Sequence, residues 1–600
     1  MREFSTPLTT DVPSTGNLTG NLTDDVVRNA REAGDRVAFS RRGADGGWED
    51  ITAAQFLAEV TAVAKGLIAA GIGVGDRVAL MSKTRYEWTL LDYAIWFAGA
   101  VTVPVYETSS AEQVSWILED SGARAVVVEG PDHLGKVHEV RGGLGALEHV
   151  WSFSDNAVGT LTSLGTDVSD EAVEDRRTST TPLDLATLIY TSGTTGRPKG
   201  CMLTHGNFMF ELSVAVAELD DVFHQEDSST LLFLPLAHVF ARIIQIGCVK
   251  SQTRLGHSAD IKNLMTDLQE FRPSFLLAVP RVFEKVFNTA SQRAAADGRG
   301  RVFDRAAQTA IDYSRALDRG RVPLRTRAQH AVFDRLVYGK LRAALGGRCE
   351  HAVSGGAPLG DKLGHFYRGI GLTVLEGYGL TETTAALTLN VPDALKIGSV
   401  GRPLPGTAVR VADDGELLFA GGQVFAGYWH NEEATGEALE RNGWFHTGDL
   451  GEVDDEGFVK ITGRKKEILV TAGGKNVAPT VLEDRLRLHL LVDQCMVVGD
   501  GEPFIAALVT IDAEAFAVWA GQHGKTGSVA DHVDDPDLRA AVQDAVDEAN
   551  KAVSKAESIR KFTILPGEWT EEGGQLTPSL KLKRHVVMRE LKDEVAALYL

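Results

Sequence analysis

The stretch Tyr190-Thr-Ser-Gly-Thr-Thr-Gly-Arg-Pro-Lys-Gly200 follows the apolar run 185–189 and decides how the rest of the chain is interpreted. It combines three glycines, four hydroxyl side chains besides that of Tyr190, and two cations. A strand that ends in such a loop presents backbone N–H groups, hydroxyls and positive charge at one place, as a polyphosphate requires. The predicted phosphate-binding residues are Thr191, Ser192, Gly193, Thr194, Thr195, Gly196 and Lys199. The competing interpretation is a solvated turn with a chance lysine.

The loop lacks the GxxxxGK[ST] spacing of kinase-type nucleotide-binding loops. Counting from Gly193, the second glycine would fall on Pro198, and Lys199 is followed by Gly200 rather than by Ser or Thr. Residues 201–204 read as a short strand, so no helix N-terminus follows at once to hold a phosphate. These differences argue against a kinase-type site.

The length and net charge of the chain indicate a protein of several domains that does not bind nucleic acid. A chain of 600 residues is too long for one hydrophobic core, so several domains are expected. The net charge of −21 disfavours nonspecific binding to nucleic acid or to anionic lipid. We therefore expect no nucleic-acid partner, and an anionic ligand must rely on local basic residues.

The sequence favours a reducing, cytoplasmic location. Four cysteines lie far apart without CxxC spacing, which gives no zinc signature and fits buried thiols. The N-terminus has no apolar segment typical of a secretory signal. The longest apolar region, 90–105, contains Asp92, Gly99 and Pro104 and reads as a buried helix leading into a core strand. Any membrane contact would therefore be peripheral, at the inner membrane face.

Helical and strand patterns alternate from about residue 27 to 180. Strands such as 78–81 and 125–128 are apolar throughout, which indicates a mainly parallel sheet covered on both faces. The same alternation resumes after the loop, with strands expected at 231–236 and 275–279. These patterns predict two doubly wound α/β units with ligand-binding loops at the carboxyl ends of their strands.

The pattern changes twice further along the chain. Residues 284–347 are rich in Ala, Arg and Leu without a strand-like run, so we expect a helical insertion; a solvated helical hairpin is the simplest role for it. From about 398 to 460, short strands are broken by Gly, Pro and Asp, as in a small antiparallel barrel or sheet. The last segment reads as an α+β unit after a polar linker at 462–467.

Two long motifs now point to a family. Asn442-Gly-Trp-Phe-His-Thr-Gly-Asp-Leu450 and the run from Gly463-Arg-Lys-Lys-Glu467 to Pro479 resemble the fatty-acyl signature of the adenylate-forming, AMP-binding enzymes. Within that superfamily the chain looks like a long-chain fatty acyl-CoA synthetase, from about residue 25 to the C-terminus. The resemblance is more specific than the phosphate loop because it is long, gapless and rich in unusual residues.

The resemblance and the patterns together predict an α/β fold. We expect a large N-terminal domain of two doubly wound α/β subdomains plus a small β-barrel, with a smaller mobile α+β C-terminal domain. The expected boundaries are a tail at 1–24, an AMP-binding domain at 25–463 that includes the insertion at 284–347 and the barrel-like part at 398–460, and a C-terminal lid domain at 464–600.

The resemblance also implies a reaction. A long-chain fatty acid would be joined to coenzyme A through an acyl-adenylate, with ATP and Mg²⁺ required and AMP and pyrophosphate released. Transfer of the acyl group to a carrier protein is the close alternative. An inactive nucleotide-binding homologue is a third possibility, but a decayed site would be expected to lose some of Lys199, Glu382, Asp449, Arg464 and Lys581. The oligomeric state is not indicated.

Roles carried over from the family concern first the nucleotide. The loop from Thr191 to Lys199 would hold the β- and γ-phosphates. Glu382 would help to hold Mg²⁺, which prefers carboxylate and phosphate oxygens. Thr381 would donate to the α-phosphate, and Tyr378 would lie along the adenine. The small residues expected around the base are Gly355, Gly356, Ala357, Gly377 and Gly379, and an ordinary strand-to-helix turn is the rival interpretation of 355–357.

The remaining roles fall near the domain junction and the C-terminus. Asp449 and Arg464 would bind the ribose hydroxyls. Lys581 matches the lysine that reaches the α-phosphate and the carboxylate during adenylation, and Lys583, two residues away, is the rival assignment. The resemblance implies that the C-terminal domain then rotates, withdraws Lys581 and presents the segment around Gly473 to the pantetheine of coenzyme A.

Three further residues are less clearly assigned. Lys466 lies at the position of the family's hinge. His238 matches a segment that forms the wall of the acyl pocket, but a buried structural histidine is an equal alternative. His205, just after the phosphate loop, is expected to be structural.

Overall fold

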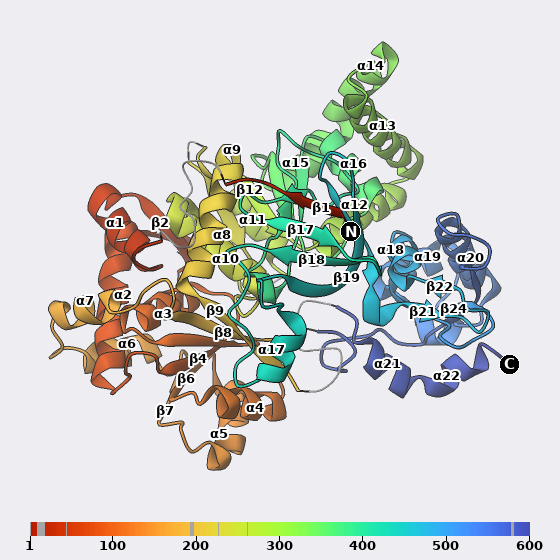
Figure 1. Ribbon diagram of the computed structural model, residues 1–600. Helices are drawn as coiled ribbons and strands as arrows, with labels where there is room; N and C mark the ends of the chain where they lie inside the picture. The colour runs from red at the N-terminus through yellow and green to blue at the C-terminus, as the bar shows by residue number, and fades with distance from the viewer. Residues whose placement is uncertain are drawn as a thin grey trace.

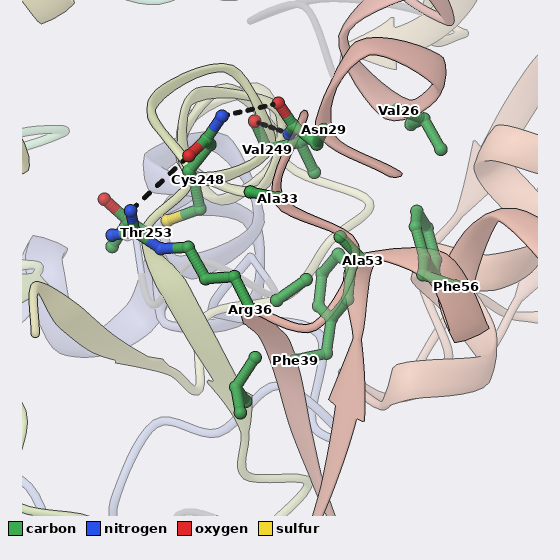
Figure 2. A pocket seen from close by; sticks show the side chains of 13 residues that line it. Val26, Asn29, Ala33, Arg36, Phe39, Ala53, Phe56, Cys248, Val249 and Thr253 are labelled. Carbon is green, nitrogen blue, oxygen red and sulfur yellow. Dashed lines mark hydrogen bonds between the residues drawn. The ribbon is translucent and has the colours of Figure 1, made fainter. Parts of the chain in front are cut away.

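The computed structural model describes residues 2–8, 18–43, 45–191, 197–225, 227–260, 262–577 and 581–600. Figure 1 shows a large body, coloured red to cyan, and a smaller unit at its side that is formed by the blue C-terminal part of the chain. Helices cover mixed and parallel sheets in the large body, which confirms the predicted α/β class.

A six-stranded sheet carries the predicted phosphate loop. Its order is β7-β6-β4-β5-β8-β9, and all its pairs are parallel except the antiparallel β8–β9 hairpin. Thr191 at the end of β8 is the register partner of Lys199 at the start of β9. The strand predicted at 201–204 is confirmed as part of β9, which pairs antiparallel with β8. The strands are β7 (His149–Ser152), β6 (Ala125–Val128), β4 (Arg77–Met81), β5 (Val101–Val105), β8 (Leu185–Thr191) and β9 (Lys199–Thr204).

Two further sheets form the second unit of the body. One has the order β10-β11-β2-β3, in which β10 and β11 pair in parallel. The other has the order β12-β13-β14-β15-β16, and its first three strands are parallel. The expected strand at 231–236 is shorter and starts earlier in the structure. The strands are β10 (Ser229–Leu232), β11 (Arg254–His257), β2 (Val37–Arg42), β3 (Trp48–Thr52), β12 (Phe275–Ala278), β13 (His351–Ser354), β14 (Thr373–Tyr378), β15 (Thr388–Leu389) and β16 (Arg402–Pro403).

The predicted barrel region forms a five-stranded antiparallel sheet of order β1-β17-β18-β19-β20. In the described residues β1 and β20 are its edges, so no pairing between them closes a barrel. The sequence analysis assigned β1 to a tail, but Phe4 packs against Gly457, where a Cβ atom would lie 2.2 Å from the ring. The strands are β1 (Arg2–Ser5), β17 (Ala408–Val411), β18 (Glu416–Ala420), β19 (Phe445–Val453) and β20 (Val459–Arg464).

Residues 280–344 form helices joined by short turns, and α13 and α14 extend from the large body at the upper right of Figure 1. Gly369 at the end of α16 (Asp361–Gly369) fits so closely against Ala310 that a Cβ atom would lie 2.1 Å from the Ala310 carbonyl oxygen. This contact packs α13, which contains Ala310, against α16 of the large body. The helices are α12 (Pro280–Ala296), α13 (Gly300–Asp318), α14 (Leu324–Phe333) and α15 (Gly339–Ala344), with a π-helical turn η3 (Asp334–Tyr338) before α15.

The C-terminal unit has a sheet of order β23-β24-β25, packed against helices that include α18 and α20. Its own core is separate from that of the large body. An ion pair joins the two, because Arg281 of α12 donates to Asp493 of β23. The elements are α18 (Pro479–Leu486), β23 (Val492–Val498), β24 (Ile505–Ile511), α20 (Pro536–Asn550) and β25 (Ile559–Ile564).

The apolar region at 90–105 forms a helix and a core strand, as predicted. Nearly every residue of α3 (Tyr86–Phe97) is buried, and β5 follows it. Its one charged interior residue, Asp92, is fully buried beside Arg242 of α10 (Val239–Ser251), and Thr102 also donates to it at 2.8 Å. A buried carboxylate needs such partners, since an unpaired charge in the core is costly.

All four cysteines are buried free thiols. Within the described ranges, the helices include none with the length and apolar character needed to cross a bilayer.

Candidate active site

Asp449 on β19 connects two predicted nucleotide-binding residues. It is the register partner of Arg464 on the neighbouring strand β20, so the antiparallel pairing places their side chains together. Arg464 Nε donates to Asp449 Oδ1 at 2.9 Å, and the Tyr378 hydroxyl donates to Asp449 Oδ2 at 2.5 Å. Burial and the Asp449 charge raise the pKa of Tyr378 well above its usual range, so Tyr378 remains a neutral donor.

Glu382 and Lys199 meet at the side chain of Tyr428. The Tyr428 hydroxyl donates to Glu382 Oε1 at 2.8 Å, and Lys199 Nζ lies 5.0 Å from the centre of the tyrosine ring. This arrangement brings the lysine of the phosphate loop to the predicted metal-binding carboxylate. The ring orients the carboxylate and offers its face to the cation.

The turn that carries Glu382 is strained and firmly held. It is η4 (Thr381–Thr383), after β14, and the two residues that follow it, Thr384 and Ala385, have φ angles of 56° and 119°. Such conformations cost free energy in non-glycine residues. The backbone N–H of Ala386 donates at 3.0 Å to the buried Glu211, whose pKa is raised well above its usual range by burial. A neutral carboxyl group still accepts this bond through its carbonyl oxygen.

Lys581 arrives from the C-terminal unit on a short hairpin. Its backbone N–H donates to Thr577 Oγ1 at 3.0 Å, the Thr577 N–H donates to the Lys581 carbonyl at 2.8 Å, and Leu576 bridges to Leu582. Residues 578–580 lie outside the described range. The hairpin fixes the direction in which Lys581 leaves the backbone.

The Lys581 amine interacts electrostatically with three other predicted site residues, Arg464, Asp449 and Glu382. Burial and the nearby Arg464 guanidinium lower the pKa of Lys581, while Asp449 and Glu382 act in the opposite direction. The residue keeps exposed surface, yet enough protein surrounds its amine to desolvate it. These interactions favour Lys581 over its neighbour Lys583 as the lysine that serves the site.

His238 lies near the same amine. It caps α10, since its Nδ1 accepts the backbone N–H of Phe240 at 3.1 Å. Burial, together with the charge of Lys581, lowers the pKa of His238 to about 3, so the ring is neutral. His238 is thus a half-buried helix cap in the field of Lys581, and its role in the wall of the acyl pocket stays a prediction. His205 is buried and accepts a backbone N–H from Leu22 at 3.4 Å, as a structural residue would.

The predicted glycines differ in how much space the structure leaves for a side chain. A Cβ atom on Gly379 would lie 1.4 Å from the carbonyl oxygen of Ala385, and one on Gly377 would lie 3.1 Å from that of Thr388. At Gly355 the nearest atoms, including the Gly377 carbonyl oxygen, lie 3.5 Å away, which is ordinary contact. The backbone segments around 355 and 377 are thus adjacent, and Gly379 is the position that tolerates no side chain.

We expect Gly379→Ala to destabilise the protein by about 3 kcal/mol or more and to abolish turnover, because the backbone of the strained turn must move. Thermal unfolding and the steady-state rate measure the two effects. Gly355→Ala is the matched control and should unfold within about 1 kcal/mol of the parent protein, since its Cβ meets no close atom. Equal destabilisation by both substitutions would contradict this reading of the turn.

The structure does not place every predicted residue in the cluster. Ser192, Gly193, Thr194, Thr195 and Gly196 lie outside the described range, so their phosphate-binding role stays a prediction. Thr381, beside Glu382, makes no side-chain hydrogen bond to other described residues. Gly356, with φ of 83°, and Ala357 follow the carboxyl end of β13.

Gly473 stands apart from the cluster. It is exposed in the turn between β21 (Leu469–Val470) and β22 (Asn476–Val477), and its contacts in the described structure do not reach Asp449 or Lys581. The role expected for it, at the pantetheine channel, belongs to a rotated C-terminal domain and stays a prediction.

Sequence analysis missed Tyr428 and Glu211. Tyr428 belongs to Gly427-Tyr-Trp429, in which nothing distinguishes the tyrosine from its neighbour without the fold. Glu211 is the only charged residue in the mostly apolar run 208–217, and a lone carboxylate on a buried helix face is a signal that could have marked it.

The arrangement combines three cations, Lys199, Arg464 and Lys581, with two carboxylates, Glu382 and Asp449. Cations at one place neutralise phosphate groups, while a buried carboxylate accepts hydrogen bonds from vicinal hydroxyls. These properties suit a nucleoside phosphate. Residues 26–429 match the sequence profile of the AMP-binding enzymes, and residues 466–600 match that of the AMP-binding enzyme C-terminal domain.

The chain belongs to the AMP-binding enzyme family. It is 53% identical, over the whole of both chains, to proteins of Mycobacterium tuberculosis and Mycobacterium bovis that are named long-chain-fatty-acid–CoA ligase FadD15. A solved structure of the anthranilate CoA ligase AuaEII in complex with anthranoyl-AMP superposes with a TM-score of 0.73. That structure is 20% identical and covers 97% of this chain and all of its own, so it supports the two-part fold of the family.

Proposed function

We propose that this protein is an ATP-dependent ligase that joins a long-chain fatty acid to coenzyme A through an acyl-adenylate, releasing AMP and pyrophosphate. The observation that carries the proposal is the convergence of Lys581, from near the C-terminus, on Asp449, Arg464 and Glu382. The mycobacterial relatives, which match the full length at 53% identity, carry the name of this activity.

In the proposed site the nucleotide is held from several sides. Asp449 accepts hydrogen bonds from the ribose hydroxyls, since each carboxylate oxygen that binds Arg464 or Tyr378 retains a further lone pair. Lys199, together with the loop that starts at Thr191, neutralises the β- and γ-phosphates. The small residues at 355–357, 377 and 379 leave room for the base beside the backbone.

The residues present fit a magnesium ion held mainly by substrate. Among the described residues no group of three or more His, Cys, Asp or Glu side chains could bind a metal. Glu382 alone, with Tyr428 bound to one of its oxygens, supplies a carboxylate beside Lys199. Mg²⁺ binds well to one carboxylate, phosphate oxygens and water, and it would neutralise phosphate charge there.

Lys581 serves the first half-reaction. A fatty-acid carboxylate oxygen attacks the α-phosphorus of ATP, a P–O bond to pyrophosphate breaks, and negative charge accumulates where two anions meet. A fixed ammonium group at that point lowers the barrier. Thr381, beside Glu382, donates to the α-phosphate in this proposal.

For the second half-reaction we propose that residues 464–600 act as a lid on the domain 25–463 and rotate about Lys466. Rotation withdraws Lys581 and brings the segment around Gly473 to the pantetheine thiol, which attacks the acyl carbonyl while AMP leaves. We place the reaction in the cytoplasm, with peripheral contact at the inner membrane face.

Turnover across a panel of acids from acetate to very long chains tests the proposal. With ATP and coenzyme A, AMP release should be greatest for long-chain acids such as palmitate and should depend on coenzyme A. The parallel assay replaces coenzyme A with an acyl carrier protein. Formation of the adenylate without acylation of coenzyme A, but with acylation of the carrier, would replace the proposed ligase with the carrier-dependent alternative.

A further inference from the structure

The helical insertion is strongly basic in an acidic protein. Residues 299–342 contain eleven arginines and lysines against four aspartates, a net charge of +7, whereas the whole chain has −21. The remainder of the chain is thus even more acidic than the total shows. A positive segment of this size, in a protein that otherwise repels anionic surfaces, concentrates attraction for an anionic partner in one place.

The basic segment lies at the periphery of the molecule. Figure 1 shows α14 at the outer tip of the green helices, away from the body and from the C-terminal unit. Helix α13 buries one side, including Phe303, Ala306 and Ala310, whereas α14 has no buried residue. The tip of the insertion is therefore open to a partner and lies far from the catalytic cluster.

Apolar side chains form an outward-facing row on this tip. Leu324, Ala328, Val332 and Leu336 recur every fourth residue, which places them along one side of a helix. Leu324 is 81% exposed, Val332 56% and Leu336 55%. Leu317 at the end of α13 is exposed as well. Several large apolar side chains gathered on one protruding surface indicate an interaction site.

Arginines flank the row and are available to a partner. Arg321, Arg325, Arg327 and Arg335 are exposed, and their side chains form no ion pair with any residue that the structure describes. Elsewhere in the insertion, Arg342 pairs with Asp334, which shows that acidic partners are used where they exist. The four arginines at the tip keep their charge for an external ligand.

The combination of arginine and exposed leucine favours one class of partner. Nucleic acid would be bound through phosphates by the arginines, but an exposed aliphatic row gains nothing from a phosphate backbone. At a bilayer surface, both kinds of side chain are satisfied, since aliphatic groups enter the acyl boundary while guanidinium groups bind anionic headgroups.

We propose that the tip of the insertion, residues 317–336, docks the protein on the surface of an anionic phospholipid membrane. The apolar row enters the interface, and the flanking arginines contact the headgroups. The docking surface does not depend on the ligase activity. It offers a place at which a water-insoluble acid can be taken from the bilayer.

Vesicle flotation of the full-length protein tests the proposal. Vesicles of phosphatidylcholine alone are compared with vesicles that contain phosphatidylglycerol. Because each of the four arginines contributes about fivefold to binding at an anionic surface, we expect at least about a hundredfold stronger partitioning to the anionic vesicles, decreasing with salt. The variant L324S/V332S/L336S should lose about tenfold of this partitioning, and R321Q/R325Q/R327Q/R335Q should lose at least about a hundredfold.

Matched controls remove side chains of the same kind elsewhere on the surface. V74S/L164S/L183S replaces three other exposed apolar residues, and R31Q/R36Q/R560Q/R589Q replaces four other exposed arginines. Both controls should partition as the parent protein does. All variants should keep the parent rate with a short, soluble acid in the absence of vesicles, which shows that they are folded.

Two outcomes would overturn the proposal. One is equal partitioning of the parent protein and both tip variants to anionic vesicles. The other is binding to a DNA duplex at physiological salt, measured by fluorescence anisotropy, that depends on the four arginines while anionic vesicles bind no better than neutral ones. That second result would assign the basic tip to nucleic acid instead.

Discussion

Lys581→Ala is expected to reduce adenylation by about 10²–10³-fold, because it removes the cation that faces the developing charge at the α-phosphorus. The expectation depends on the placement of this amine in the field of Arg464, Asp449 and Glu382. The measurement is palmitate-dependent pyrophosphate exchange. Thioester formation from supplied palmitoyl-adenylate should fall much less, since the proposed lid rotation withdraws Lys581 before that step.

Lys583→Ala is the matched control for this prediction. Lys583 lies two residues away at the start of α21 (Arg584–Glu590), where its backbone N–H donates to the Gln575 carbonyl at 2.8 Å. Its replacement should leave adenylation within a few-fold of the parent rate. Equal loss of both half-reactions in Lys581→Ala would reject the role assigned to this lysine.

The alkaline side of the pH profile gives a second readout for Lys581. Burial and Arg464 lower its pKa, so the charged form is lost at a lower pH than for an ordinary lysine. Adenylation should therefore decline as the pH rises through that lowered value. Thioester formation from supplied adenylate should not share the decline, and the Lys581→Ala variant should lack it.

Strand pattern predicted much of the fold because apolar runs are local signals. The strands at 78–81, 101–105 and 125–128 lie within one residue of their expected positions, and all belong to the sheet that carries the phosphate loop. β1 could not be predicted in this way. It is short and polar, and it gains its place only through pairing with β17, about four hundred residues later in the chain.

The residues of the candidate site also differ in whether a local sequence pattern could predict them. Residues inside long motifs, such as Asp449 and Arg464, could be named from the sequence because the motif itself is specific. Tyr428 and Glu211 act through contacts with a distant turn. No local pattern distinguishes Tyr428, and the lone carboxylate at Glu211 marks a buried position without showing its partner. The sequence names the charged groups of the site, while the side chains that orient those groups become visible only with the fold.

Asp449→Ala is expected to lower kcat/KM for ATP by about 10²–10⁴-fold, since hydrogen bonds to a charged group contribute about 1.5–3 kcal/mol each and two ribose hydroxyls would lose their acceptor. Direct titration with AMP should show a loss of similar size, because the ribose is common to both nucleotides. The effect on thermal stability should be small. The Arg464 side chain, left without its partner, is 40% exposed and can be solvated.

Tyr378→Phe separates the ribose contact from the support of Asp449. This variant removes only the hydroxyl that donates to Asp449 Oδ2 and keeps the ring that would lie along the adenine. If Asp449 binds the ribose directly, Tyr378→Phe should cost no more than about tenfold in kcat/KM for ATP, far less than Asp449→Ala. If AMP affinity fell equally in both variants, Asp449 would act mainly by holding Tyr378. The ribose would then need another acceptor.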